Sequence, residues 1–187
     1  MTTAIEPTAG SRSSYAPGLI AIHWITALVF VVIFASIELR EYYPRGSEMR
    51  DFLKATHKSF GMLILLLALL RITLKSRNST PPIVPPLPAW QTGLSHLVHL
   101  ILYAAMIAMP LLGWLMSSAS GGSVPFFGLQ IAPIIAPDKE LAHTLEEIHE
   151  FIGNALYYVI GLHALAALFH HYIVKDNTLL RMVRTSH

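Results

Sequence analysis

The chain has 187 residues, of which 53 % are hydrophobic and only 13 % are charged, whereas soluble domains carry about 25 % charged residues. This composition excludes an ordinary soluble domain and predicts an integral membrane protein. The absence of cysteine excludes disulfides, iron–sulfur clusters, thiolate metal sites and the C-x-x-C-H attachment of c-type haem. Basic residues at membrane edges account for the net charge of +2, so we expect no nucleic-acid partner.

The N-terminal part of the chain contains a tail and two apolar runs. Residues 1–17 are small and polar, which predicts a disordered tail. The first apolar run, from Gly18 to Leu39, is long enough to cross a bilayer as a helix and carries His23 near its start. The second run, from Phe52 to Leu74, has the same length class and carries His57 in its second turn.

Two more apolar runs follow. The third, from Gly93 to Ser117, begins with His96 and His99. A connection over residues 119–142 is interrupted by Gly and Pro but stays apolar, and we expect it to lie along the membrane interface. The fourth run, from Ile148 to Ile173, again spans a bilayer. The pattern predicts an all-α membrane protein built as a four-transmembrane-helix bundle.

An even number of spans places both ends of the chain on one side of the membrane. Seven of the lysines and arginines fall on that side and six on the other. Because cytoplasmic segments carry the excess of Lys and Arg, this small bias favours cytoplasmic termini. The predicted organisation is a tail over residues 1–17, a helical domain over residues 18–174, and a basic cytoplasmic tail over residues 175–187.

Polar residues inside the apolar runs are costly in lipid and indicate a function. His149 and His163 are fourteen positions apart, which amounts to about 1400° and about 21 Å along a helix, so both lie on one face near opposite membrane edges. Alternating helix directions match His163 in depth with His23 at the inner edge, and His149 with His57 at the outer edge. Two facing imidazoles at each level suit bis-histidine haem b. The alternative is four unrelated interfacial histidines.

Arg71 lies fourteen residues after His57, so it shares the face of His57 at the inner level. A guanidinium at this position is suited to bind the propionates of an inner haem. The alternative is that Arg71 extends to the cytoplasmic lipid headgroups.

Further histidines and a tryptophan gather at the inner edge. His170 follows His163 by seven residues and lies on nearly the same face, where it is suited to bind a quinone head group or simply to meet the interface. Trp90 is a second candidate for the quinone site, although the aromatic belt of membrane proteins also explains it. His96 and His99 are interpreted as neighbours of a propionate or quinone, and not as iron ligands.

Several segments resemble the bacterial cytochrome b561 family, closest to its small di-haem members. They are IAIHW (20–24), HKSFG (57–61), TGLSHLVH (92–99) and GLHALAALFHHYIVKDNTLLRM (161–182). The resemblance implies two haem b groups, with iron ligands at the four histidines that the depth argument selects, His23, His57, His149 and His163. It also implies a multi-pass protein of the bacterial inner membrane that passes electrons from periplasmic superoxide through the haems to ubiquinone, with no obligatory protein partner evident.

Superoxide is an anion and needs a positive approach. Lys54 and Lys58 flank His57 and are the predicted residues for this approach. Two other functions remain open. One is a cytochrome b electron-transfer subunit that docks a dehydrogenase or hydrogenase. The other is a histidine-based metal or proton transporter, for which acidic residues would be expected in the centres of the spans, where the sequence has none.

Overall fold

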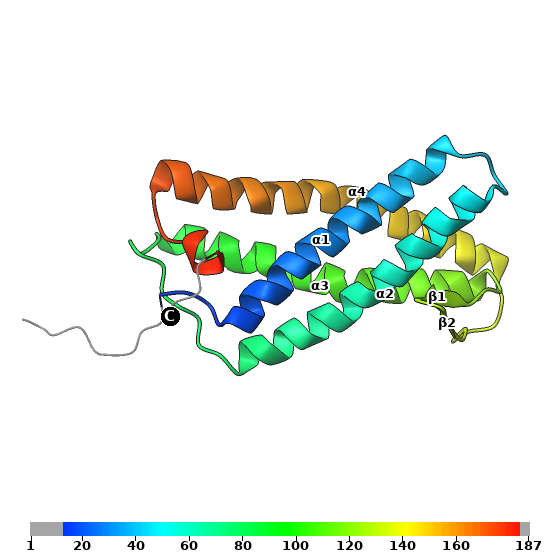
Figure 1. The fold of residues 1–187 in the computed structure, drawn as a ribbon, viewed down its shortest axis with the longest axis horizontal. Helices are drawn as coiled ribbons and strands as arrows, with labels where there is room; N and C mark the ends of the chain where they lie inside the picture. Colours follow the sequence, from blue (N-terminus) through cyan, green and yellow to red (C-terminus); the bar gives the residue numbers. More distant parts are fainter. Residues whose placement is uncertain (1–12, 184–187) are drawn as a thin grey trace, which may run out of the picture.

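In the computed structural model, residues 13–183 are described, and they form an elongated bundle of four long helices (Figure 1). In chain order the helices are α1 (Pro17–Leu39), α2 (Glu48–Ser76), α3 (Ala89–Ala119) and α4 (Lys139–Phe169). Each of the four is long and apolar enough to cross a bilayer. The predicted four-helix membrane bundle is confirmed.

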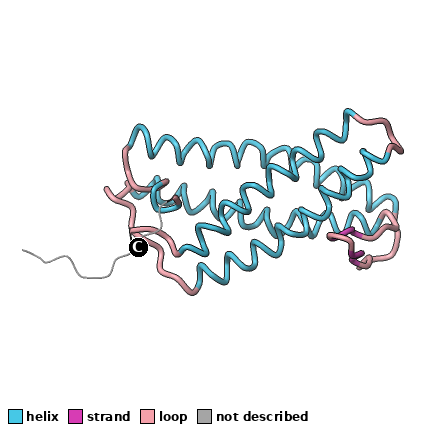
Figure 2. Tube along the Cα trace, in the orientation of Figure 1, coloured by secondary structure: helices cyan, strands magenta, loops and turns pink. Residues whose placement is uncertain are grey.

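The bundle has two distinct ends. At one, here called the termini end, lie the start of α1, the end of α4 and the connection between α2 and α3 (Figure 2). At the other, here called the hairpin end, lie the α1–α2 connection and a short pair of strands between α3 and α4. The long axis between the two ends therefore corresponds to the direction across the membrane.

Two of the helices that begin before their apolar runs, α2 and α4, are capped by polar side chains. Ser47 Oγ accepts a hydrogen bond from Arg50 N at 3.3 Å and starts α2 at Glu48. Asp138 Oδ1 accepts hydrogen bonds from the backbone N–H groups of Glu140 and Leu141, each at 3.0 Å, and starts α4. A carboxylate at this position also interacts favourably with the helix dipole. The first turns of α2 and α4 thus extend beyond the apolar runs.

The connection between α3 and α4 contains a β-hairpin, which the sequence does not predict. Strand β1 (Val124–Phe126) pairs antiparallel with β2 (Leu129–Ile131). The two turn residues, Phe127 and Gly128, both have positive φ, as the tight turns that suit the twist of a hairpin require. The hairpin packs on α2, where Ser59 Oγ donates to Pro125 O at 2.9 Å. This connection folds back on the bundle and does not run freely along the interface.

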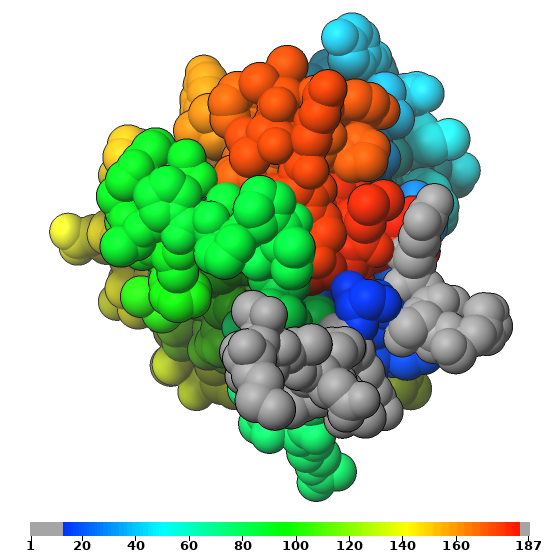
Figure 3. Space-filling model, turned by 90° about the vertical axis from the view of Figure 1, so that its left-hand side faces the viewer, coloured from blue at the N-terminus to red at the C-terminus, as the bar shows by residue number. Residues whose placement is uncertain are grey.

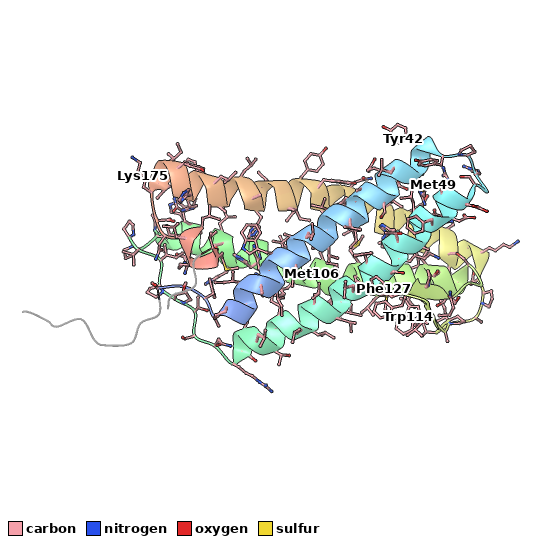
Figure 4. All side chains as sticks on the ribbon, viewed as in Figure 1. Tyr42, Met49, Met106, Trp114, Phe127 and Lys175 are labelled. Atoms are coloured by element: carbon pink, nitrogen blue, oxygen red, sulfur yellow. The ribbon has the colours of Figure 1, made fainter. Side chains whose placement is uncertain are left out.

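The helices associate as two pairs. Helix α1 packs along α2, and α3 packs along α4, while α2 and α3 join the pairs. The apolar core lies among α1, α2 and α3, midway between the two ends; Met106 marks its level in Figure 4. Its buried residues are Val29, Ile33, Ile64, Ala68 and Met106. All residues of α4 are described, and only Leu156 among them is buried. Helix α4 therefore meets α1 and α2 mainly through side chains that point into the bundle.

Both chain ends contribute to a cap over the termini end. The C-terminal segment, residues 175–183, lies between the end of α4 and the start of α1 (Figure 3). Trp24 Nε1 donates to Met182 O at 2.8 Å, and Tyr15 N donates to Arg181 O at 3.0 Å. The Arg181 guanidinium donates to Pro81 O of the α2–α3 connection.

The predicted tails differ in part from this arrangement. The composition predicts a disordered tail over residues 1–17, but Tyr15 pairs with the C-terminal segment and Pro17 already begins α1. The rest of that prediction, residues 1–12, lies outside the described residues. The basic C-terminal tail is folded as far as Val183, because Asp176 and Arg181 are buried in the cap.

Candidate functional site

At the hairpin end, one imidazole of α2 faces one imidazole of α4. The ring centres of His57 and His149 lie 6.2 Å apart, with an angle of 71° between the ring planes. The backbones of α2 and α4 are not in extensive contact, so the two side chains bridge the space between the helix pairs. His57 and His149, which the sequence analysis places at the same depth, therefore lie opposite each other in the structure.

At the termini end, His23 of α1 and His163 of α4 form a second pair with nearly the same geometry. Their ring centres lie 6.3 Å apart, with an angle of 70° between the planes. The fourteen-residue separation of His149 and His163 on α4 places this pair about 21 Å from the first along the helix. The structure therefore contains two similar imidazole pairs at two depths of one bundle.

The separation within each pair has a chemical meaning. A bond from a metal ion to an imidazole nitrogen is about 2 Å long, so two axial imidazoles place their nitrogens about 4 Å apart and their ring centres roughly 6 Å apart. The observed 6.2 and 6.3 Å agree with this value. Direct hydrogen bonding or stacking of two imidazoles would instead need a closer approach of nitrogens or ring faces.

Hydrogen bonds show which nitrogen is free in these rings. His57 Nδ1 lies 3.2 Å from Ile33 O, so it carries the proton and donates, which leaves Nε2 unprotonated for a metal. In the described part of the chain, Nδ1 of His23 and Nδ1 of His149 are buried without a hydrogen-bond partner. Buried polar atoms normally have a partner, and each pair contains one such orphaned nitrogen.

Glycines keep the space around the hairpin-end pair open. A Cβ on Gly113 of α3 would lie 3.4 Å from His149 Cε1, in van der Waals contact, so the ring lies directly against α3 at this position. Gly61 follows His57 by one helical turn on α2, and a Cβ there would meet no atom within 4 Å.

A third imidazole joins the pair at the termini end. His99 of α3 has its ring centre 5.4 Å from that of His163, and its Nδ1 donates to Ser95 O at 2.6 Å. The sequence placed His99 at the correct depth but gave it no partner. The prediction overlooked that His163 can face α1 and α3 at once, because depth along a helix does not report the rotation of neighbouring helices.

Arg71 lies at the same level, as predicted. Together with His23, His99 and His163 it lines a cavity that is partly open to the surroundings. The Arg71 guanidinium carbon is 5.6 Å from the ring centre of Tyr103, and Lys75 Nζ is 5.5 Å from the same ring. These cation–π contacts hold the guanidinium toward the cavity. Tyr103 was not predicted; its spacing of four residues after His99 on α3 was the available signal.

The two lysines proposed for superoxide lie at the hairpin end. Lys58 is half-buried and donates from Nζ to Ser117 Oγ at 2.6 Å, whereas Lys54 is exposed one turn earlier. Among the described residues, no carboxylate lies within ion-pair distance of either lysine. By contrast, Arg40 and Arg50 both pair with Glu41. The two lysines are therefore the uncompensated cations beside His57.

The two quinone candidates are placed differently at the termini end. Trp90 is 68 % exposed in the first turn of α3 and does not line the cavity. The side chain of His170 is 15 % exposed, and its Nδ1 lies 2.6 Å from Asp176 Oδ2. The sequence analysis did not single out Asp176, although it lies in the same segment as His170, residues 161–182. Of the remaining inner-edge histidines, His171 makes a ring contact with its neighbour Tyr172.

Four bilayer-length helices that carry opposed imidazoles between them define a membrane cytochrome of the b type. The model of the prokaryotic cytochrome b561 family matches residues 14–185, and the chain belongs to this family. Membership implies electron transfer in a bacterial membrane and the binding of haem b.

Three relatives match over most of the chain. It is 43 % identical over 164 residues to cytochrome b561 homolog 1 of Escherichia coli (88 % of this chain, 93 % of the relative). It is equally similar, 43 % over 164 residues, to the probable superoxide oxidase CybB of Yersinia pestis (88 % and 92 %). Cytochrome b561 homolog 2 of E. coli is 26 % identical over 174 residues (89 % of each chain).

The residues present fit haem b. The ring centres of each pair have the separation expected of two imidazoles on one metal ion, and two ring nitrogens are buried without a partner among the described residues. The donor set of neutral imidazoles without thiolate is that of b-type centres with two histidine ligands. His57 and His149, and His23 and His163, are thus the residues suited to hold the group.

Proposed function

We propose that the four paired histidines hold two haem b groups, one at each end of the bundle, and that the protein transfers electrons from superoxide to ubiquinone. The observation that carries the proposal is the repetition of one imidazole geometry at two depths. Haem b, when bound, supplies one-electron redox chemistry at iron. His57 and His149 would hold one group and His23 and His163 the other, and the two groups would then relay electrons between the ends of the bundle.

The overall reaction balances with two superoxide anions for each quinone. Two superoxide anions lose one electron each and become dioxygen, while ubiquinone gains the two electrons and two protons and becomes ubiquinol. The relative from Y. pestis, named as a probable superoxide oxidase, supports superoxide as the donor. The chain's own residues must therefore attract an anion at one end and supply protons at the other.

The hairpin end is suited to the anion. Lys54 and Lys58 lie one helical turn apart beside His57, without a carboxylate partner in the described part of the chain. Exposed cations next to a redox centre raise the local concentration of an anionic substrate. Ser117 holds the ammonium of Lys58 in a fixed position, so that its charge stays close to the hairpin-end pair.

The termini end is suited to the quinone. Arg71 faces the cavity beside His23 and His163, where its guanidinium can bind carboxylate groups of a haem. His170 presents one ring nitrogen for a hydrogen bond to a quinone carbonyl, and Trp90 offers an exposed aromatic face at the same end. With the termini in the cytoplasm of a bacterium, this end meets the cytoplasmic side of the inner membrane and the hairpin end meets the periplasm.

An optical titration of the purified protein tests the proposal. Low-spin haem spectra with two haems per chain, reduction on addition of superoxide, and reoxidation on addition of ubiquinone are expected. One haem per chain would overturn the ligand assignment. Haem that superoxide does not reduce would overturn the proposal that superoxide is the electron donor. Co-purification of a large catalytic subunit that reduces the haems would favour the alternative, an electron-transfer subunit of a dehydrogenase or hydrogenase.

A further inference from the structure

The end of α4 departs from regular helix in a way that fixes one carboxylate. After Phe169 the chain makes a π-helical turn, His170–Val174, and Lys175 adopts a left-handed conformation with φ of 61°. A non-glycine residue in this conformation is uncommon. The turn is closed by a hydrogen bond from Asp176 N to His170 O at 3.1 Å. Figure 4 labels Lys175 at this end of α4.

The Asp176 side chain is completely buried by this turn, with 0 % exposure. Its Oδ1 accepts a hydrogen bond from Thr178 N at 2.7 Å, and its Oδ2 lies 2.6 Å from His170 Nδ1. Burial by itself raises the pKa of the Asp176 carboxyl, but the hydrogen bonds from Thr178 and His170 outweigh it and lower the pKa below its ordinary value. The carboxylate form is thus favoured.

The contact determines the state of the His170 ring. Because a carboxylate only accepts hydrogen bonds, Nδ1 must carry the proton and donate. The structure gives Nε2 no hydrogen bond to any described residue, and Nε2 is not among the buried atoms that lack a partner. Nε2 is therefore the nitrogen available to a ligand.

We infer that Asp176 is a positioning residue for proton delivery, holding His170 so that Nε2 gives a proton to the quinone oxygen as the quinone is reduced at the termini end. The inference rests on the proposed function, which supplies the electron. In the step, the Nε2–H bond breaks and an O–H bond forms on the quinone. The ring retains its Nδ1–H on Asp176, and water at the membrane surface then returns a proton to Nε2.

The variant Asp176→Asn tests the inference. Asparagine keeps an oxygen for Thr178 N–H, but its amide nitrogen cannot accept from His170 Nδ1. Loss of a positioned general acid costs about 10²- to 10⁴-fold in rate. We expect ubiquinone reduction to slow by about 10²-fold or more, while superoxide still reduces the haems and the haems still reduce ferricyanide, which takes an electron without a proton.

Asp138→Asn is the matched control. Asp138 is also an aspartate at an end of α4 that accepts backbone hydrogen bonds, but it contacts no histidine among the described residues. Its replacement should leave the rates of ubiquinone reduction and ferricyanide reduction unchanged. Equal slowing with ubiquinone and ferricyanide in Asp176→Asn would assign Asp176 a purely structural role and overturn the inference. An unchanged rate with ubiquinone would overturn it as well.

Two measurements do not depend on the stability of that variant. His170→Gln leaves the bond between Asp176 and Thr178 in place and should slow ubiquinone selectively; an unchanged ratio of the two acceptor rates would contradict the inference. Nitrogen NMR of the unaltered protein with labelled histidine should show a protonated Nδ1 for His170, and an unprotonated Nδ1 would contradict the inference. Protein that superoxide cannot reduce, but that reduces ubiquinone after treatment with dithionite, would overturn the proposed donor and leave this inference standing.

Discussion

His99 and His163 approach each other more closely than His23 and His163 do, with ring centres 5.4 Å apart against 6.3 Å. Imidazoles from α1 and α3 thus converge on one imidazole of α4. Only the longer separation matches two axial ligands on opposite sides of a metal, because about 4 Å between nitrogens places the ring centres roughly 6 Å apart. The structure therefore favours His23 as the partner of His163, with His99 beside the pair.

The first prediction separates these two histidines. His23→Gln should remove the termini-end haem, so that the haem content falls from two to one per chain. His99→Gln should keep both haems, because the ring centres of His99 and His163 lie 5.4 Å apart, closer than two imidazoles on opposite sides of one metal ion. Pyridine haemochrome analysis of the purified variants measures the content. A loss of haem in His99→Gln but not in His23→Gln would reverse the assignment.

The second prediction concerns the independence of the two levels. His149→Ala should remove only the hairpin-end haem, and His163→Ala only the termini-end haem, because the pairs are about 21 Å apart along α4. Haem content and reduced-minus-oxidised spectra of each variant check this. Loss of both haems in each variant, or loss of neither, would contradict the pairing.

The third prediction tests the close approach of α3 to His149. Gly113→Val should displace the ring, since even a Cβ at this position lies 3.4 Å from His149 Cε1. The expected result is lower occupancy and an altered low-spin signal of the hairpin-end haem in electron paramagnetic resonance. Gly93→Val is the control on the same helix, because a Cβ on Gly93 meets nothing within 4 Å. An effect of equal size in both variants would point to a general change in α3.

The fourth prediction assigns a redox role to Arg71. A cation near haem favours the reduced iron, which carries one positive charge less, so Arg71→Gln should lower the midpoint potential of the termini-end haem. A change of several tens of millivolts is expected, where about 59 mV corresponds to about 1.4 kcal/mol for one electron. Arg71→Lys should retain most of the potential. A potentiometric titration that shows identical potentials for Arg71→Gln and the unaltered protein would exclude this role.

The fifth prediction concerns the approach of superoxide. Lys58→Gln, and more strongly the double change with Lys54→Gln, should slow the reduction of the haems by superoxide at low ionic strength. The effect should shrink as salt increases, because a Debye length of about 10 Å at 0.1 M screens the attraction. Lys139→Gln changes one charge at the same end, on α4. Stopped-flow rates that fall equally in Lys139→Gln would show that only net charge matters.

The four spans and the two histidine pairs could be predicted from the sequence, and the reason is physical. Rise and rotation along a helix fix the depth and face of His149 and His163, and alternating helix directions then match them to His57 and His23. Bilayer thickness makes these depths comparable among the four helices. The same periodicity placed Arg71 at the level where the structure has it.

Other contacts depend on structural details that no regular spacing of residues in the sequence reports. The approach of His99 to His163 depends on the rotation of α3 relative to α4, which spacing within one helix does not report. The contact between His170 and Asp176 depends on a π-helical turn and on the left-handed conformation of Lys175. The β-hairpin has strands of three residues each, too short for an alternating pattern to be recognised.

The pairing of the helices has a consequence for how the protein is assembled. Helix α1 packs along α2, and α3 packs along α4. The chain therefore consists of two helical hairpins, the α1–α2 hairpin and the α3–α4 hairpin, and the interface inside each one needs no cofactor. Two such units can enter the bilayer one after the other during synthesis. Each imidazole pair takes one member from each hairpin. Haem insertion is thus expected to be the late step that joins the two hairpins, and its supply would set the yield of finished protein.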